Sequence, residues 1–293
     1  MVSGIIPLVR FGCAGSIKLA RDINPSFVVV PIYDLISSSN AKPNELFRKI
    51  KRLGGFHNAL DYHGVVILSS IMKDNLIKKF ELSKYAEIIN ELKPDFYFTP
   101  DGLTYERKDS ESLRELVRIS SLTSKLIEMC PHSRPIGLVK GSDDFQIKEH
   151  KNFLKRLGVK VFAFHTSDFF RQGDNNMIQK AKHYCSIIKD EENTLLLYGL
   201  GFPRRMLEFS FADLFITNTH FVNAKHRKRF VGARRETDYN KSVYELALHN
   251  FKEISNYLKK LKYQTKLFSG GKCKWAEELQ EQLSIIRAQK VNN

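Results

Sequence analysis

The stretch LLLYGLGFPRRMLEFSFADLFITNTHF, residues 195–221, decides the fold that this sequence predicts. Residues 195–197 are an apolar run that ends shortly before Gly199, as is typical of a strand buried in a parallel sheet. Pro203 suits the first turn of a following helix, where the N–H that proline lacks would have no partner in any case. Residues 213–216 predict the next strand. The stretch therefore predicts two parallel strands whose carboxyl ends meet at one edge, where a barrel carries its chemistry.

The remainder of the chain repeats this rhythm of strand and helix. Strands are predicted near residues 28, 66, 97, 138, 162, 196 and 215, with helical patterns between them. Such alternation requires parallel strands and right-handed crossovers, which leaves a doubly wound sheet and a (β/α)8 barrel as solutions. No GxGxxG follows the first strand, which counts against a dinucleotide-binding sheet. The length and the strand count favour an α/β fold, a (β/α)8 TIM-like barrel with one irregular or missed strand.

The two ends of the chain have a different character. Residues 1–25 read as irregular or hairpin-like, with Gly12 and Gly15 as breakers. Beyond the predicted barrel, a helix is expected at residues 241–261, then a loop at 263–274 and a final helix whose apolar stripe indicates packing. The sequence thus predicts a barrel over residues 1–262 and a C-terminal helical extension of the same domain over residues 263–293.

The composition indicates the class of partner. The 293 residues carry 47 Lys and Arg against 32 Asp and Glu, a formal net charge of +15. Nucleic acid is the first anionic partner that this excess suggests, and a compositional bias toward lysine is the alternative. The four cysteines form no CxxC, and neither a cleavable signal nor a membrane-spanning apolar run is apparent. We therefore expect a cytoplasmic protein with no membrane partner.

The positive charge is concentrated in one segment, residues 225–235 (KHRKRFVGARR). This segment is either a phosphate-contacting surface or a solvated loop, and the sequence leaves both readings open. As a phosphate-contacting surface it would use six side chains: Lys225, Arg227, Lys228, Arg229, Arg234 and Arg235.

Four local motifs occur in an order that resembles one family. They are TPD at residues 99–101, LVKG at 138–141, YGLGFP at 198–203 followed by ADLF at 212–215, and LHN at 248–250. In this order they resemble the tRNA-guanine transglycosylase superfamily, which includes archaeosine enzymes and DNA-modifying relatives that insert 7-deazapurines. The resemblance covers roughly residues 27–261, and the third motif is its most specific part.

The resemblance implies an activity and a set of site residues. Members of the family exchange a base in a polynucleotide: an aspartate attacks the sugar, and an incoming 7-deazaguanine displaces the covalent intermediate. Such chemistry needs one carboxylate as nucleophile, a second that recognises or deprotonates the base, and a basic surface for the phosphates. No cofactor is implied. The positions expected to contact the base are Lys140, Gly141, Gly199, Gly201, Asn218 and His220.

The chain departs from the family pattern at the catalytic positions. The family nucleophile directly follows its Asp-x-Phe strand, where this chain has Ile216, and an early Asp-Ser-Gly is replaced by residues 69–71, SSI. The family's zinc cysteines precede its His-Asn motif, but no cysteine lies between Cys185 and Cys273. His249 is therefore interpreted as a capping or core histidine, and no metal site is predicted.

Two carboxylates remain as catalytic candidates. Asp101 follows a predicted strand, although Pro-Asp-Gly is also a common turn sequence. Asp168 follows the strand predicted near residue 162, and its alternative role is to cap the segment that comes after it. Asp213, in contrast, begins its strand and so lies at the wrong end of a barrel for chemistry.

Three hypotheses for the function follow. The first is a transglycosylase-like protein that binds tRNA or DNA, acts in 7-deazapurine modification, and works as a non-catalytic partner of a catalytic transglycosylase subunit or as a homodimer. The second is an active, diverged pentosyltransferase that exchanges bases by means of Asp101 or Asp168. The third is an unrelated TIM-barrel enzyme that acts on an anionic small molecule.

Overall fold

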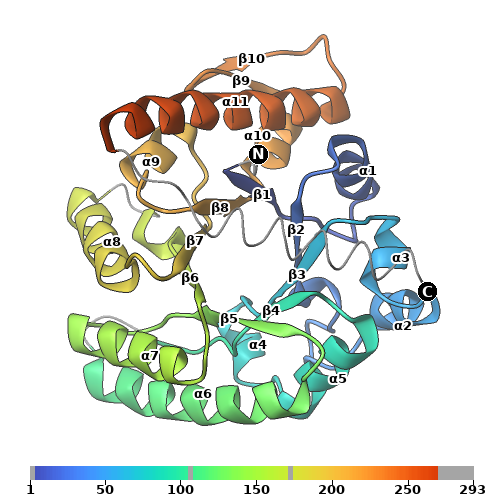
Figure 1. Ribbon diagram of the computed structural model, residues 1–293. Helices are drawn as coiled ribbons and strands as arrows, with labels where there is room; N and C mark the ends of the chain where they lie inside the picture. Colours follow the sequence, from blue (N-terminus) through green and yellow to red (C-terminus); the bar gives the residue numbers. More distant parts are fainter. Residues whose placement is uncertain (1–3, 105–107, 171–173, 270–293) are drawn as a thin grey trace.

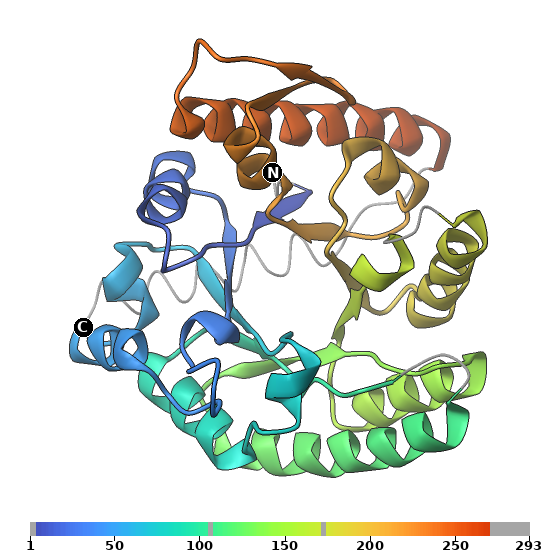
Figure 2. The ribbon, with the colours of Figure 1, turned by 180° about the vertical axis from the view of Figure 1, so that it is seen from behind.

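The computed structural model, which describes residues 4–104, 108–170 and 174–269, is a barrel of eight parallel strands inside a ring of helices (Figure 1). The view from behind shows the same ring (Figure 2). The strands are β1 (Ile5–Pro7), β2 (Phe27–Pro31), β3 (Val65–Ser69), β4 (Phe96–Phe98), β5 (Arg134–Leu138), β6 (Val161–His165), β7 (Thr194–Tyr198) and β8 (Leu214–Thr217).

The sheet order closes the barrel and confirms the predicted fold class. Each strand from β2 to β8 pairs in parallel with the next, and β8 pairs with β1. The ring is completed between β1 and β2, where Leu8 bridges Val29 and the Val9 N–H donates to the Val29 carbonyl at 2.7 Å. The strand missed in the sequence is therefore β1.

The prediction of an irregular or hairpin-like N-terminal region is wrong, because this region contains a strand and a helix. Residues Ile5–Pro7 form β1, and Ala14–Ile23 form the helix α1. A three-residue strand is too short to show a periodicity, which explains why it was missed. Gly12 does lie in a turn, but Gly15 lies inside α1, where a Cβ would come within 3.2 Å of the Phe221 ring.

Alternation along each strand separates two apolar layers. In β7, Leu196 and Tyr198 belong to the cluster that fills the barrel, whereas Leu195 and Leu197 pack with the helices outside. Because successive side chains of a strand point to opposite faces, an uninterrupted apolar run satisfies both layers at once. The opening stretch of the sequence is apolar for this reason.

The helices cover the outside of the barrel. After α1 they are α2 (Glu45–Arg52), α3 (Phe56–Leu60), α4 (Asp74–Ile77), α5 (Leu82–Leu92), α6 (Asp109–Met129), α7 (Asp144–Arg156), α8 (Asn175–Ile188), α9 (Pro203–Glu208), α10 (Thr219–Lys225) and α11 (Val243–Ser269). Two short 3-10 turns, η1 (Ile32–Asp34) and η2 (Ser167–Phe170), follow β2 and β6. None of the helices among the described residues combines the length and apolarity needed to cross a membrane.

The C-terminal region differs from its prediction in two ways. Much of the basic segment is a β-hairpin, β9 (Lys228–Val231) with β10 (Arg234–Thr237), which lies on the outer side of α11 (Figure 1). The helix α11 runs to Ser269, so the loop expected from residue 263 is helical over its first residues and the 262/263 boundary falls within α11. The expected final helix lies outside the described residues.

Candidate functional site at the mouth of the barrel

Polar side chains collect at the carboxyl ends of the strands, the end that carries the chemistry in barrels of this kind. Below this rim the barrel is filled by apolar residues. The polar residues that follow or end a strand there are Arg10, Tyr33, Asp34, Ser69, Ser70, Asp101, Lys140, His165 and Tyr198. We call this group the mouth.

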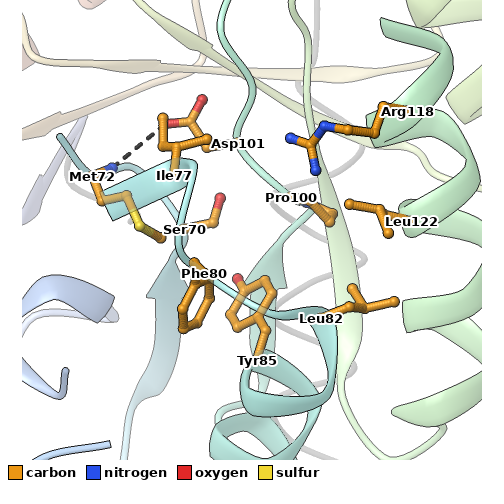
Figure 3. Close-up of a pocket in the computed structure, with 10 residues that line it drawn as sticks. All are labelled: Ser70, Met72, Ile77, Phe80, Leu82, Tyr85, Pro100, Asp101, Arg118 and Leu122. Carbon is orange, nitrogen blue, oxygen red and sulfur yellow. Dashed lines mark hydrogen bonds between the residues drawn. The ribbon is translucent and has the colours of Figure 1, made fainter. Parts of the chain in front are cut away.

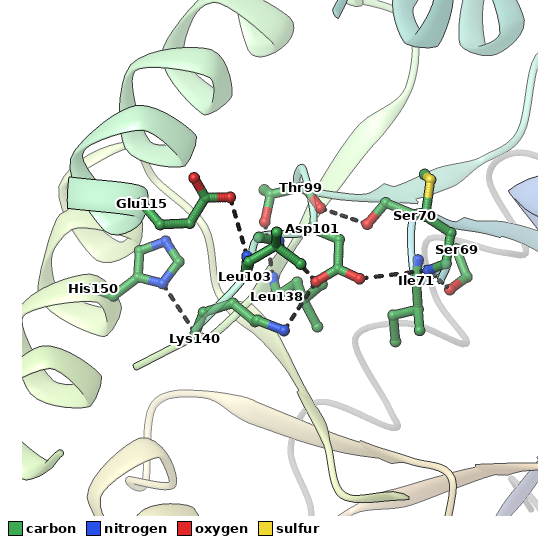
Figure 4. A network of polar contacts seen from close by, with 12 residues as sticks. Ser69, Ser70, Ile71, Thr99, Asp101, Leu103, Glu115, Leu138, Lys140 and His150 are labelled. Atoms are coloured by element: carbon green, nitrogen blue, oxygen red, sulfur yellow. Dashed lines mark hydrogen bonds and ion pairs between the residues drawn. The ribbon is translucent and has the colours of Figure 1, made fainter. Parts of the chain in front are cut away.

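An ion pair between Asp101 and Lys140 forms one half of the mouth (Figure 4). The Lys140 Nζ lies 2.9 Å from the Asp101 Oδ1, and the two side chains are 16% and 4% exposed. The same Oδ1 accepts the Gly102 N–H at 2.8 Å, whereas from the described part of the chain Oδ2 receives only a long 3.4 Å contact from the Met72 N–H. Among the described residues Lys140 Nζ has no second partner. Both partners thus keep hydrogen-bonding capacity for a ligand.

Buried hydrogen bonds fix the strand ends that carry this pair. The Lys140 N–H donates to His150 Nδ1 at 3.0 Å, and burial lowers the pKa of His150 to about 4, so its ring is neutral near pH 7. The Leu138 N–H donates to the Thr99 hydroxyl at 2.9 Å. The Ser70 hydroxyl donates to the Thr99 carbonyl at 2.7 Å. The ends of β3, β4 and β5 are therefore tied together beneath the pair.

A second ion pair forms the other half of the mouth. The Arg10 Nε lies 2.7 Å and 3.0 Å from the two carboxylate oxygens of Asp34, and the guanidinium lies 4.7 Å above the centre of the Tyr33 ring. Asp34 also accepts the Phe11 N–H at 3.0 Å. Burial raises the pKa of Asp34, although the Arg10 charge acts in the opposite direction.

Tyr198 ends β7 and belongs to the apolar cluster that fills the barrel. Its ring packs edge-on against Phe98 inside the barrel, with 6.3 Å between centres, and against His165 at 5.5 Å. Burial raises the pKa of its hydroxyl strongly, and the charges of both Arg10 and Asp101 act on it.

A small pocket opens beside Asp101 on the side of α5 and α6 (Figure 3). Its volume of about 30 Å³ is enough for a water molecule or a small substituent. Its walls are mostly apolar, with Phe80, Leu82 and Leu122 among them, and Arg118 lies at its edge. Arg118 is held by Glu115, whose Oε1 lies 2.7 Å from its Nη2.

The structure explains why glycine occupies two of the positions that were expected to contact the base. At Gly141 a Cβ would come within 2.8 Å of the Ile147 backbone nitrogen in α7. Gly199 has a φ of +97°, and a Cβ there would lie 2.0 Å from the Ser167 hydroxyl. The Gly201 carbonyl accepts a hydrogen bond from the Thr219 hydroxyl. Backbone conformation and close packing thus favour glycine at 141 and 199 whether or not a base binds there.

The other predicted site residues are dispersed. Asp168 is exposed in η2 behind β6, and Asn218 is half-buried at the start of α10. His220 was expected on the rim, but it is 1% exposed and its ring packs against Phe251 of α11 at 5.4 Å. Burial lowers its pKa to about 3. His220 therefore belongs to the helical layer, because α10 turns back along the outside of the barrel directly after β8.

The position that corresponds to the family nucleophile is apolar and interior. Ile216 is 1% exposed, pairs in register with Ile6 and Tyr198, and belongs to the cluster that fills the barrel. At the second departure Ser69 stands at the carboxylate position as a buried hydroxyl that ends β3, and Ile71 packs in the same apolar cluster. Neither departure offers a carboxylate.

The basic hairpin is fixed to the barrel by the motif at residues 248–250. His249 Nε2 bonds the Phe230 carbonyl at 2.9 Å, and Asn250 Oδ1 accepts the Phe230 N–H at 2.7 Å. Asn250 Nδ2 also donates to the carbonyls of His220 and Lys228. His249 is therefore a structural histidine, as its sequence context indicated, and the hairpin is presented as a rigid element.

The six predicted phosphate-contacting residues differ in their surroundings. Arg229 pairs with Glu236 at 2.7 Å, and Arg227 donates to the Lys241 carbonyl. Arg235 lies 4.3 Å above the Phe202 ring, and Lys225 lies 5.2 Å from the Phe221 ring centre. Lys228 bonds the Thr237 hydroxyl, while Arg234 is exposed and no described carboxylate pairs with it.

Sequence reasoning missed Arg10, Tyr33, Asp34 and Tyr198. Tyr33 and Asp34 directly follow the predicted strand at residues 27–30, and Tyr198 follows the run at 195–197, so the rule that named Asp101 would also have selected them. Arg10 had no such signal, because β1 was not recognised.

No group of three His, Cys, Asp or Glu side chains among the described residues is arranged to hold a metal ion. No family model matches the chain, and a search of the curated proteins found no significant match.

Proposed function

We propose that this chain is a transglycosylase-like (β/α)8 protein that binds tRNA or DNA and receives one of its bases at the mouth, as part of 7-deazapurine modification. The observation that carries the proposal is the buried pair of Asp101 and Lys140 at the ends of β4 and β5. The sequence resemblance implies a base contact at Lys140, and Asp101 is one of the two catalytic candidates that the sequence offers.

The chemistry of the pair suits a guanine-type base. Guanine presents N–H donors at N1 and N2 and an acceptor at O6, and lysine commonly donates to O6 in base recognition. The Asp101 Oδ2, which has only one long contact, accepts from the base, and the remaining Lys140 donors bond O6. A base that has left its stack is recognised in this manner by hydrogen bonds to its polar edge.

The basic hairpin supports the polynucleotide as the carrier of that base. Arg234 and Arg235 in β10 have no carboxylate partner among the described residues, nor does the neighbouring Lys225 at the end of α10, and the motif at residues 248–250 holds β9 against α11. Exposed cations on a rigid element bind phosphates and release counterions, so binding to nucleic acid weakens as salt is raised.

The role of a non-catalytic partner fits the interior Ile216 at the family nucleophile position. In this role the chain holds the nucleic acid while a catalytic transglycosylase subunit carries out the exchange.

One observation favours a second candidate, an active base-exchange enzyme: the mouth holds a second buried carboxylate, Asp34, in addition to Asp101. In this reaction a carboxylate oxygen bonds to C1′ of the sugar as the C1′–N9 bond breaks, and the displaced base leaves with a proton. The incoming base then loses its N9 proton, bonds to C1′ and releases the carboxylate.

The test is incorporation of labelled guanine or 7-deazaguanine into tRNA and DNA, by this protein alone and with a catalytic transglycosylase. Stimulation of the catalytic subunit without incorporation by the protein alone supports the partner role, and incorporation by the protein alone establishes the active enzyme. Binding to polynucleotide that does not change with salt would contradict both, and would favour an enzyme acting on an anionic small molecule.

Asp101→Asn examines the base contact itself. Loss of a charge-assisted hydrogen bond should weaken base-dependent binding by about 10- to 100-fold. Asp61→Asn is the matched control, because that carboxylate is exposed and precedes β3 at the opposite end of the barrel. Equal effects of the two substitutions would remove Asp101 from the proposed site.

A further inference from the structure

We propose that Arg10 is a preorganised phosphate-binding residue, and that it holds the phosphate of the nucleotide whose base enters the mouth. The structure positions its guanidinium by means of Asp34 and Tyr33, and leaves its outer edge without a carboxylate among the described residues. The ligand class, a phosphate ester, follows from Arg10 alone; its assignment to the base that contacts Asp101 rests on the proposed function.

The first support is the fixed orientation of the side chain. Arg10 Nε bonds both oxygens of Asp34, and the guanidinium lies over the Tyr33 ring. The Arg10 backbone N–H donates to the Ser16 hydroxyl at 3.1 Å. Ordering a long side chain costs conformational entropy on binding, and here folding has already ordered it.

The second support is the edge of the guanidinium that no carboxylate occupies. In the described parts of the chain, Asp34 contacts Arg10 through Nε alone, and the guanidinium also interacts with the neutral Tyr33 hydroxyl, on whose pKa its charge has a lowering effect. The side chain is 40% exposed, whereas Asp34 is 5% exposed. The two terminal nitrogens thus form an accessible fork of donors, which is the geometry that binds two oxygens of a phosphate.

The third support is that the loop around Arg10 offers the fork no competing anion. Asp34 already accepts hydrogen bonds from Arg10 Nε and from the Phe11 N–H. The first turn of α1 contains no acidic residue. An anion at the outer edge therefore meets the guanidinium from the side opposite Asp34.

Arg10 and Asp101 lie at the same end of the barrel, after β1 and after β4. A base bonded to Asp101 and Lys140 carries its sugar and phosphate away from the pair and toward the rim, where Arg10 is exposed.

Two sources of phosphate share this chemistry, a diester within a polynucleotide and the monoester of a free nucleotide. The polynucleotide arm uses a labelled single-stranded oligonucleotide in which one phosphate at a time is replaced by an uncharged methylphosphonate. The free-nucleotide arm compares GMP with guanosine. Each probe is titrated against the full chain, against Arg10→Gln, and against Arg52→Gln, which removes the same charge from an exposed arginine of α2.

If the proposal holds, one ligand pair shows a phosphate-dependent gain of about 10- to 100-fold with the unaltered protein and with Arg52→Gln. The gain is abolished in Arg10→Gln. Weaker binding when one particular phosphate is replaced by methylphosphonate identifies the diester, and tighter binding of GMP than of guanosine identifies the monoester. No gain in either arm, or equal losses in both arginine variants, would overturn the proposal.

A second variant guards against a folding defect, because Arg10→Gln leaves the buried Asp34 without its cation. Arg10→Gln/Asp34→Asn replaces the pair by two neutral amides, and should lose the same phosphate-dependent gain with a thermal unfolding temperature near that of the unaltered protein. The binding arms involve no base exchange. They remain informative if the exchange assay fails, so failure of the proposed function and failure of the Arg10 site can be told apart.

Discussion

The two ends of the barrel use aspartate in opposite ways. At the amino ends, Asp95 and Asp213 each precede a strand, and the Oδ2 of each accepts the backbone N–H of the neighbouring strand at 2.8 Å. The same atoms bond His57 at 3.0 Å and Lys189 at 2.8 Å. At the mouth, Asp34 and Asp101 follow their strands and are bonded to loop amides and to cations that retain unused donors.

This difference separates the carboxylates that hold strands together from the carboxylates of the mouth better than burial does. The side chains of Asp95 and Asp213 are 22% and 20% exposed, against 5% and 4% for Asp34 and Asp101. The more exposed acids are the ones that hold strands together, and the more buried acids face partners with spare hydrogen-bonding capacity. Position relative to the strand is thus the informative variable, as the general placement of barrel active sites suggests.

The largest effect that would test this contrast is on stability, from Asp95→Ala. The substitution leaves the Val66 N–H and His57 without their acceptor, and we expect the free energy of unfolding to fall by about 2 to 4 kcal/mol. Urea denaturation measures the loss, and Asp95→Asn, which keeps an acceptor oxygen, should lose less. Phosphate and base binding should not change. A loss of ligand binding with stability intact would mean that the amino ends also carry function.

The sequence predicted the barrel because strands such as β2, β3 and β7 are uninterrupted apolar runs with polar residues at their ends. It predicted Asp101 and Lys140 by the same logic. It did not predict the partner of either, because pairing across β4 and β5 depends on register, and register becomes visible only when the strands are assembled. His220 was misplaced for a related reason: a residue two positions into a helix can turn away from the rim on which that helix begins.

A smaller effect concerns pH and the histidine beneath the mouth. Burial lowers the pKa of His150 to about 4, below the value of about 6.5 for an unfolded chain. Between these values the unfolded state binds the additional proton. This contribution to stability is therefore complete above about pH 6.5 and is lost as the pH falls toward 4, with a slope of at most about 1.4 kcal/mol per pH unit.

His150→Asn removes this titration and offers an amide oxygen to the Lys140 N–H. Its unfolding free energy, measured by urea denaturation from pH 7 to pH 4, should fall less steeply than that of the unaltered protein. Part of the slope should remain, because His220 is also buried with a lowered pKa. An unfolding free energy that falls with pH as steeply in His150→Asn as in the unaltered protein would show that His150 does not contribute to the pH dependence of stability.

The smallest effect extends the same distinction, between cations with and without a carboxylate, to the basic hairpin. Arg234 has no carboxylate partner among the described residues, so Arg234→Gln should reduce the salt dependence of polynucleotide binding by about 0.7 to 0.9 in log–log slope. Arg229 pairs with Glu236 at 2.7 Å and with Asp238 at 3.8 Å, so Glu236→Gln should remove its nearer carboxylate and change the slope in the opposite direction. Glu45→Gln on α2 adds the same charge away from the hairpin, where Glu45 pairs with Arg48 and Arg52. Fluorescence anisotropy titrations between low and moderate salt measure all three slopes. If Glu45→Gln changes the slope as much as Glu236→Gln does, total charge governs binding and the hairpin is not a distinct phosphate surface.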